Sequence, residues 1–159
     1  MVTSIKGNDT STFGGQVVIP SPAFSASLDT NINISSGTAT KIPYNVVNFD
    51  TNSNYDNSTN YRFTPTVAGY YQVNATISMV NVTGSVYISI YKNGSEYLRG
   101  NQDYHDVATR AGLSVSDVVY FNGSTDYIEM YASHGTGSTQ TLSGLTYINK
   151  FSAALVRAV

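Results

Sequence analysis

The chain has 159 residues and a mass of 17.1 kDa, a length typical of one domain built around a single hydrophobic core. Only 11% of the residues are charged, the net charge is -2, and the 13 tyrosines outnumber the 8 lysines and arginines. This composition excludes the basic stripe that nucleic-acid binding requires, and the lack of cysteine excludes disulfides and cysteine-based zinc sites. No apolar run approaches the roughly 18 residues that insertion into a membrane requires.

The first part of the chain is polar and rich in glycine, serine and threonine. Residues 1–19 predict an N-terminal arm or linker, and Pro20 and Pro22 block a helix just beyond it. Residues 1–20 contain no apolar stretch of signal-peptide length, so we expect no export by a standard leader. The remaining residues, 20–159, are expected to form one domain.

Strand signals begin directly after the arm. Residues 23–28 alternate in polarity and predict a strand, and residues 41–50 predict another. Residues 51–60 are polar and predict a turn-rich loop. From residue 70 to residue 79 the apolar side chains fall on one face and the polar ones on the other, which is the period of a half-buried strand.

The same alternation returns further along the chain. It covers residues 86–92, and Asn93-Gly94 then predicts a hairpin turn into residues 95–99. Residues 113–121 and 127–132 form a further pair, and residues 151–156 close the chain. No segment has an apolar period of 3.6 residues. The pattern predicts an all-β fold, an antiparallel sandwich or jelly roll of about ten strands.

The centre of the chain resembles the globular-head domain of the complement 1q/tumour necrosis factor superfamily. The residues that follow the spacing of that family's pattern are Tyr44, Asp50, Tyr55, Phe63, Gly69, Tyr71, Val73 and Ala75. Tyr91-Lys92-Asn93-Gly94 matches the family hairpin, and residues 151–155 match its last strand. The sequence departs from the pattern at Val73 and Ala75, where the family has aromatic residues. The resemblance implies a jelly roll that assembles as a homotrimer around a three-fold axis.

Tyrosines are the candidates for the seam between subunits, because aromatic residues are enriched where subunits meet. The predicted trimer-interface residues are Tyr71, Tyr87, Tyr91, Tyr127 and Tyr131. The alternative is that each tyrosine only covers the surface of its own sandwich.

Two segments predict binding loops at one end of the sandwich. Residues 100–112 are predicted to form a long loop, and residues 132–140 a second one rich in glycine, serine and threonine. The candidate binding residues in these loops, suited to contact a sugar or a protein surface, are Asp103, Tyr104, His105, Arg110 and His134.

The chain has few side chains that are suited to catalysis or metal binding. Asp103, His105 and Asp106 cannot all converge from an extended strand, so we predict no metal site there and no catalytic residue. We predict no cofactor; the alternative is a calcium ion held by Asp50, Asn54 and Asp56, although these residues lack the ligand spacing of a calcium loop. An enzyme such as a polysaccharide depolymerase would need paired carboxylates, for which Glu96 and Glu129 are the main candidates. Seven Asn-x-Ser/Thr glycosylation sequons occur, and the abundance of asparagine, serine and threonine accounts for most of them by chance.

These observations favour a non-enzymatic trimeric protein of a virion surface, that of a bacteriophage. It would decorate the capsid or form the knob of a tail fibre. Its arm would dock on other virion proteins, and its loops would attach to a host-surface glycan or receptor. The alternative is an extracellular, lectin-like ligand-binding head of a bacterial or animal secreted protein.

Overall fold

The computed structural model describes residues 21–159, so the predicted arm over residues 1–19 lies outside the described residues. Residues 21–159 contain no helix long and apolar enough to cross a membrane. All strand pairs are antiparallel, which confirms the predicted fold class. The strands are β1 (Ala23–Ser27), β2 (Ile32–Ile34), β3 (Thr40–Lys41), β4 (Val46–Asp50), β5 (Tyr55–Asp56), β6 (Arg62–Phe63), β7 (Gly69–Lys92), β8 (Ser95–Phe121), β9 (Ile128–His134), β10 (Gln140–Leu142) and β11 (Lys150–Ala158).

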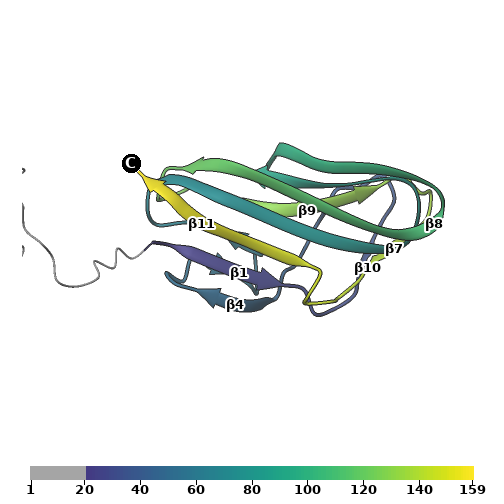
Figure 1. Ribbon diagram of the computed structural model, residues 1–159, viewed down its shortest axis with the longest axis horizontal. Helices are drawn as coiled ribbons and strands as arrows, with labels where there is room; N and C mark the ends of the chain where they lie inside the picture. The colour runs from purple at the N-terminus through teal and green to yellow at the C-terminus, as the bar shows by residue number, and fades with distance from the viewer. Residues whose placement is uncertain (1–20) are drawn as a thin grey trace, which may run out of the picture.

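Two long strands, β7 and β8, run through both layers of the sandwich (Figure 1). The first sheet has the order β4, β1, β11, the first half of β7 and the second half of β8. The second sheet contains β9, the second half of β7 and the first half of β8, with β3 and β6 on the other side of β9. The two layers therefore share their longest strands.

The structure corrects the prediction of a loop over residues 100–112, the segment in which β8 passes from one layer to the other. These residues continue β8, and His105 pairs with Gly84 of β7. Strand β7 bends where Asn81 and Gly84 adopt positive φ angles of 56° and 81° and the register shifts. Strand β8 follows β7 through this bend because pairing resumes on both sides of it, at Thr109 with Val82 and at His105 with Gly84, while residues 106–108 bulge between these pairs. The predicted loop is therefore a bent two-stranded ribbon.

Smaller differences from the prediction lie in the first third of the chain. The strand predicted over residues 41–50 is divided into β3 and β4, because Pro43 between them has no N–H to donate. Strand β5 lies within the predicted loop over residues 51–60. The short strands β2 and β10 pair with each other and were not predicted.

The core between the layers is aromatic. The ring of Phe24 stacks on Tyr55 and Phe63, with centroid separations of 4.7 and 4.5 Å, and meets Phe151 edge-on at 4.8 Å. Six residues of the predicted family pattern are buried there: Tyr44, Tyr55, Phe63, Tyr71, Val73 and Ala75. Gly69 is needed for a different reason, since a Cβ atom at that position would lie 2.3 Å from the carbonyl oxygen of Arg157 on β11. The spacing pattern therefore marks packing positions.

Candidate interaction surfaces

Tyr71 belongs to the core of the protomer, which corrects its assignment to the subunit seam. Its side chain is fully buried, and its ring packs edge-on against Phe121 with centroids 5.2 Å apart. Its hydroxyl donates to the carbonyl oxygen of Val67 at 2.8 Å. Burial raises the pKa of this hydroxyl. A side chain enclosed by its own chain cannot contact a neighbouring subunit.

Three other predicted seam residues, Tyr87, Tyr91 and Tyr131, are half-buried on β7 and β9 of the second sheet, where they contact their own chain. The rings of Tyr91 and Tyr131 stack with centroids 4.0 Å apart, and the guanidinium of Arg99 lies 3.9 Å above the ring of Tyr87. Burial, with a smaller effect from Glu129, raises the pKa of Tyr131 to about 12. These internal contacts cover part of the aromatic surface that a partner subunit would use.

Tyr127, the last predicted seam residue, is half-buried and lies just before β9. The guanidinium of Arg62 on β6 lies 4.5 Å from the centre of its ring. Its backbone N–H donates to the side-chain oxygen of Asn93 in the hairpin turn, at 2.9 Å. The residue thus connects β6, the hairpin turn and β9 within one protomer.

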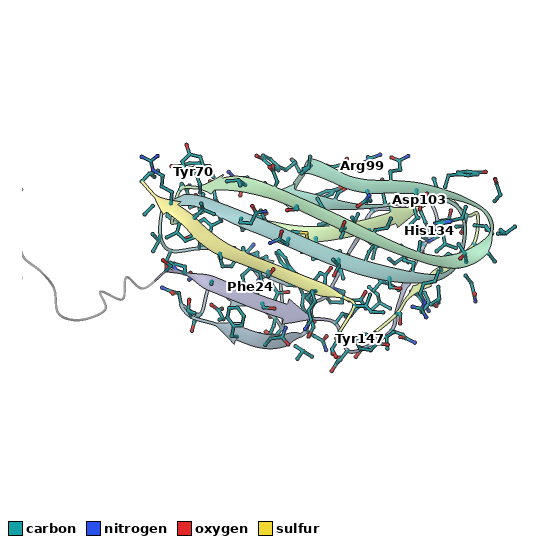
Figure 2. The ribbon with its side chains drawn as sticks, in the orientation of Figure 1. Phe24, Tyr70, Arg99, Asp103, His134 and Tyr147 are labelled. Carbon is teal, nitrogen blue, oxygen red and sulfur yellow. The ribbon has the colours of Figure 1, made fainter. Side chains whose placement is uncertain are left out.

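Four of the five predicted binding residues lie on strand β8, and Figure 2 shows one of them, Asp103, near one end of the molecule. Tyr104 is 68% exposed. His105 Nε2 lies 3.4 Å from a carboxylate oxygen of Asp103, and it is buried without a hydrogen bond in the described chain. Arg110 donates to the hydroxyl of Ser78 at 2.9 Å. Their role in binding remains a prediction, but a strand ribbon and not a loop presents them.

His134 is buried at the end of β9, which corrects its placement in a binding loop over residues 132–140. The residue ends β9 at the same end of the molecule as Asp103 (Figure 2). Its Nε2 donates to the carbonyl oxygen of Ile34 at 2.8 Å, and its Nδ1 lies 3.1 Å from the hydroxyl of Thr136. Both ring nitrogens are therefore occupied in joining β9 to β2 and to the turn that follows.

The carboxylates considered for calcium accept hydrogen bonds from their own turns. Asp50 accepts from the backbone N–H of Tyr55 at 2.8 Å. Asp56 accepts from the N–H groups of Thr59 and Ser58, at 2.9 and 3.0 Å, and these bonds lower its pKa. No group of three or more histidine, aspartate or glutamate side chains that could hold a metal occurs within residues 21–159. The two carboxylates thus have a structural role as turn acceptors.

Glu96 and Glu129, the carboxylates considered for catalysis, are both paired with cations. Glu96 bonds to Arg99 at 2.9 Å and accepts the hydroxyl of Ser89 at 2.8 Å, and these bonds lower its pKa. Glu129 is 5% exposed and forms an ion pair with Lys41. A carboxylate held in this way is poorly placed to act as a general acid or a nucleophile.

The outward face of the first sheet is the strongest candidate for a contact between subunits. We call it the uncharged face; it consists of Ser25, Tyr70, Gln72, Asn74, Ser116, Val118, Tyr120, Ser152 and Ala154, which alternate with buried residues along β1, β7, β8 and β11. Two cations of β11 border it, Lys150 at one end of the strand and Arg157, the partner of Tyr70, at the other. Tyr70, Val118 and Tyr120 are 43, 46 and 42% exposed. The central cores of interfaces are depleted of charge and enriched in aromatic residues, as this face is.

Side chains on the uncharged face bond sideways to each other. Gln72 donates to the hydroxyl of Ser116 at 2.9 Å, and this hydroxyl donates to the side-chain oxygen of Asn74 at 2.9 Å. The rings of Tyr70 and Tyr120 pair with centroids 5.5 Å apart. This face was not predicted from the sequence, although Ser116, Val118 and Tyr120 alternate with apolar residues in the predicted strand over residues 113–121.

Comparison with known proteins rests on structure, since no protein-family model and no curated protein sequence matches the chain. Murine APRIL at pH 5.0 superposes with a TM-score of 0.69 and 8% identity, covering 86% of this chain and all of that one. The Eiger TNF of S. frugiperda gives a TM-score of 0.66 and 9% identity over 89% of this chain and 96% of that one. The globular domain of zebrafish complement 1qA superposes with a TM-score of 0.64 and 17% identity, covering 88% of this chain and all of that one.

The chain has the complement 1q/tumour necrosis factor jelly-roll fold. This agrees with the resemblance drawn from the sequence. At identities of 8 to 17% the similarity establishes the fold alone. In this jelly roll, the uncharged face is the outward side of the first sheet, which contains β1 and β11, the first and last strands of the described chain.

Proposed function

We propose that this chain is a non-enzymatic head domain that assembles as a homotrimer through its uncharged face and binds a ligand outside the assembly. The observation that carries the proposal is a run of uncharged outward side chains on which Tyr70, Val118 and Tyr120 remain nearly half exposed. Within residues 21–159, charged side chains stand only at its margins, where Arg157 is paired with Tyr70 and Lys92 lies 5.7 Å from the ring centre of Tyr120. Burying the centre of this face, around Gln72, Val118 and Ala154, would gain apolar contact area without desolvating an ion. The trimeric state follows from the family resemblance.

The proposed absence of catalysis is supported by the functional groups of the chain. Glu96 and Glu129 are each paired with a cation, and His134 is enclosed in the fold. Within residues 21–159, the one charged partner of the remaining histidine, His105, is Asp103. This set supports recognition better than bond cleavage.

We place the trimer on the surface of a virion, as a capsid decoration or a fibre knob whose residues 1–19 dock on other virion proteins and whose outer surface attaches to a host. A low charged fraction with many serine, threonine and asparagine residues supports this placement by composition. The alternative, an extracellular ligand-binding head, is favoured by the fold it shares with the tumour necrosis factor and complement proteins.

A matched pair of substitutions tests where the subunits meet. Val118→Lys places a charge on the uncharged face, whereas Tyr97→Lys places one at a similarly exposed position outside it, since the two side chains are 46 and 48% exposed. We expect Val118→Lys to shift the full chain from trimer to monomer in light scattering, and Tyr97→Lys to leave the trimer intact. A trimeric Val118→Lys protein would refute the proposed seam.

A further inference from the structure

A surface hollow of about 480 Å³ opens on the first sheet beside the start of β11. Its lining includes Thr76, Gly112, Ser114, Tyr147, Ile148 and Lys150. Tyr147 stands beside the start of β11, away from Tyr70, which lies near the C-terminal end of that strand (Figure 2). The hollow and the Tyr70 end of the uncharged face thus occupy different ends of the same sheet.

The polar floor of the hollow is set by strand register. Lys150 of β11 lies opposite Thr76 of β7, and Thr76 lies opposite Ser114 of β8, so the three side chains form one row across the sheet. Gly112 continues this surface without a side chain, and a Cβ atom added there would have no neighbour within 4 Å. The hollow therefore combines a cation, two hydroxyls and free space.

An exposed aromatic ring stands at the edge of this row. Tyr147 is 76% exposed and lies in the turn before β11. The turn is closed by the N–H of Ile148, which donates to the carbonyl oxygen of Leu145 at 2.9 Å. The hydroxyl of Thr76 donates to the carbonyl oxygen of Ile148 and so attaches the turn to the sheet. The ring is thus held beside the hollow by a bonded turn.

Two cations beside the hollow make no ion pair within the described chain: Lys150, which lines it, and Arg110. Arg110 donates to the hydroxyl of Ser78, the residue opposite Gly112. No carboxylate is among the described residues that line the hollow. Positive charge without a local partner favours an anionic ligand.

We infer that this hollow binds a sugar residue that carries a carboxylate. The ring of Tyr147 offers a flat apolar surface for one face of a pyranose. The hydroxyls of Thr76 and Ser114 donate to Ile148 and Asn101, so their oxygens are left to accept from the hydroxyls of the sugar. Lys150, which lines the hollow, pairs with the carboxylate, and Arg110 adds positive charge at the side of the hollow near Ser78. This inference rests on the proposed binding function and deepens it by naming a ligand class. Apart from Arg110, the site uses none of the binding residues predicted from the sequence.

Titration of the full chain followed by amide NMR tests the inference, with sodium glucuronate, neutral methyl glucoside and sodium sulfate as probes. We expect glucuronate to shift the amides of Ser114, Tyr147 and Lys150 with saturation below about 20 mM, a range that covers weak millimolar ligands. Methyl glucoside should bind about tenfold more weakly, because it lacks the charged contact. Equal binding of the neutral sugar, an equal effect of sulfate, or unshifted amides would each overturn the inference.

Matched variants locate the site. Lys150→Gln should weaken glucuronate binding about tenfold, whereas Arg157→Gln, the same change of charge at the other end of β11, should not. Gly112→Leu should fill the hollow and abolish binding without changing the urea midpoint. If Lys150→Gln and Arg157→Gln weaken binding equally, the site is refuted.

Light scattering on the same samples separates this inference from the proposed assembly. A trimer that does not bind glucuronate would overturn the sugar site alone. A monomer that binds it would overturn the assembly alone and leave the sugar site supported.

Discussion

Buried tyrosines in this chain bond to the backbone of their own protomer. The hydroxyl of Tyr44 donates to Thr76 at 3.0 Å, that of Tyr55 to Tyr44 at 2.9 Å, and that of Tyr71 to Val67 at 2.8 Å. In each case the acceptor is a carbonyl oxygen, which would otherwise need another partner. Tyrosine therefore serves two roles in this fold, as part of the core and as surface aromatic residues.

Substitution of Tyr71 tests the core role. Tyr71→Phe removes the bond to Val67, and we expect the free energy of unfolding in urea to fall by about 1 kcal/mol without a change in oligomeric mass. Tyr71→Asp should prevent folding, because it places an unpaired carboxylate in the core. A folded, monomeric Tyr71→Asp protein would return Tyr71 to the subunit seam.

Asp56 gives the chain a predictable response to acid. The N–H groups of Thr59 and Ser58 hold the pKa of this carboxyl below its usual value in the folded state. The resulting stabilisation is fully present above the unfolded pKa of about 3.9 and is lost as the pH falls through the lower folded value.

The urea midpoints of the wild type and Asp56→Asn should therefore differ most above about pH 5 and converge towards pH 2. Because solvent screens this carboxylate, we expect a difference below about 1 kcal/mol. Asp106→Asn is the control, since Asp106 is exposed and accepts no side-chain hydrogen bond in the described chain. A constant difference across this pH range would contradict the assigned role of Asp56.

At the scale of elements, an ion pair fixes the short strand β3 to β9. Glu129 on β9 is buried, and Lys41 on β3 supplies its cation. We expect Lys41→Met to destabilise the protein by about 3 kcal/mol in urea unfolding, because it leaves a buried carboxylate unpaired. The double variant Lys41→Met/Glu129→Leu should recover much of this loss. If the double variant is as unstable as the single one, packing of Lys41 and not its charge holds β3.

The elements predicted well from sequence are those whose side chains alternate in polarity. Residues 70–79 and 151–156 were placed correctly because one face of each strand is buried. The course of β8 through residues 100–112 was missed, since its side chains are mostly exposed and its strand form depends on pairing with β7. The uncharged face was missed for a related reason: only strand order shows that Gln72, Val118 and Ala154 are neighbours.

At the scale of the whole molecule, the uncharged face determines in which expression hosts the protein can form a trimer. Asn74 on this face begins a sequon, Asn74-Ala75-Thr76. Production through an animal secretory pathway would place a glycan there, and we expect the glycosylated protein to be monomeric. Asn74→Gln should restore the trimer, while Asn33→Gln at another exposed sequon should not. A trimer that carries a glycan on Asn74 would contradict the proposed seam.

The central claim is that three copies meet through the uncharged face, and the most direct measurement is the solution mass of the unmodified full chain. Light scattering coupled to size exclusion should give three times 17.1 kDa, and this mass should persist on dilution if the face forms a stable interface. A mass of 17.1 kDa at every concentration would contradict the claim and leave the jelly roll as a monomeric domain.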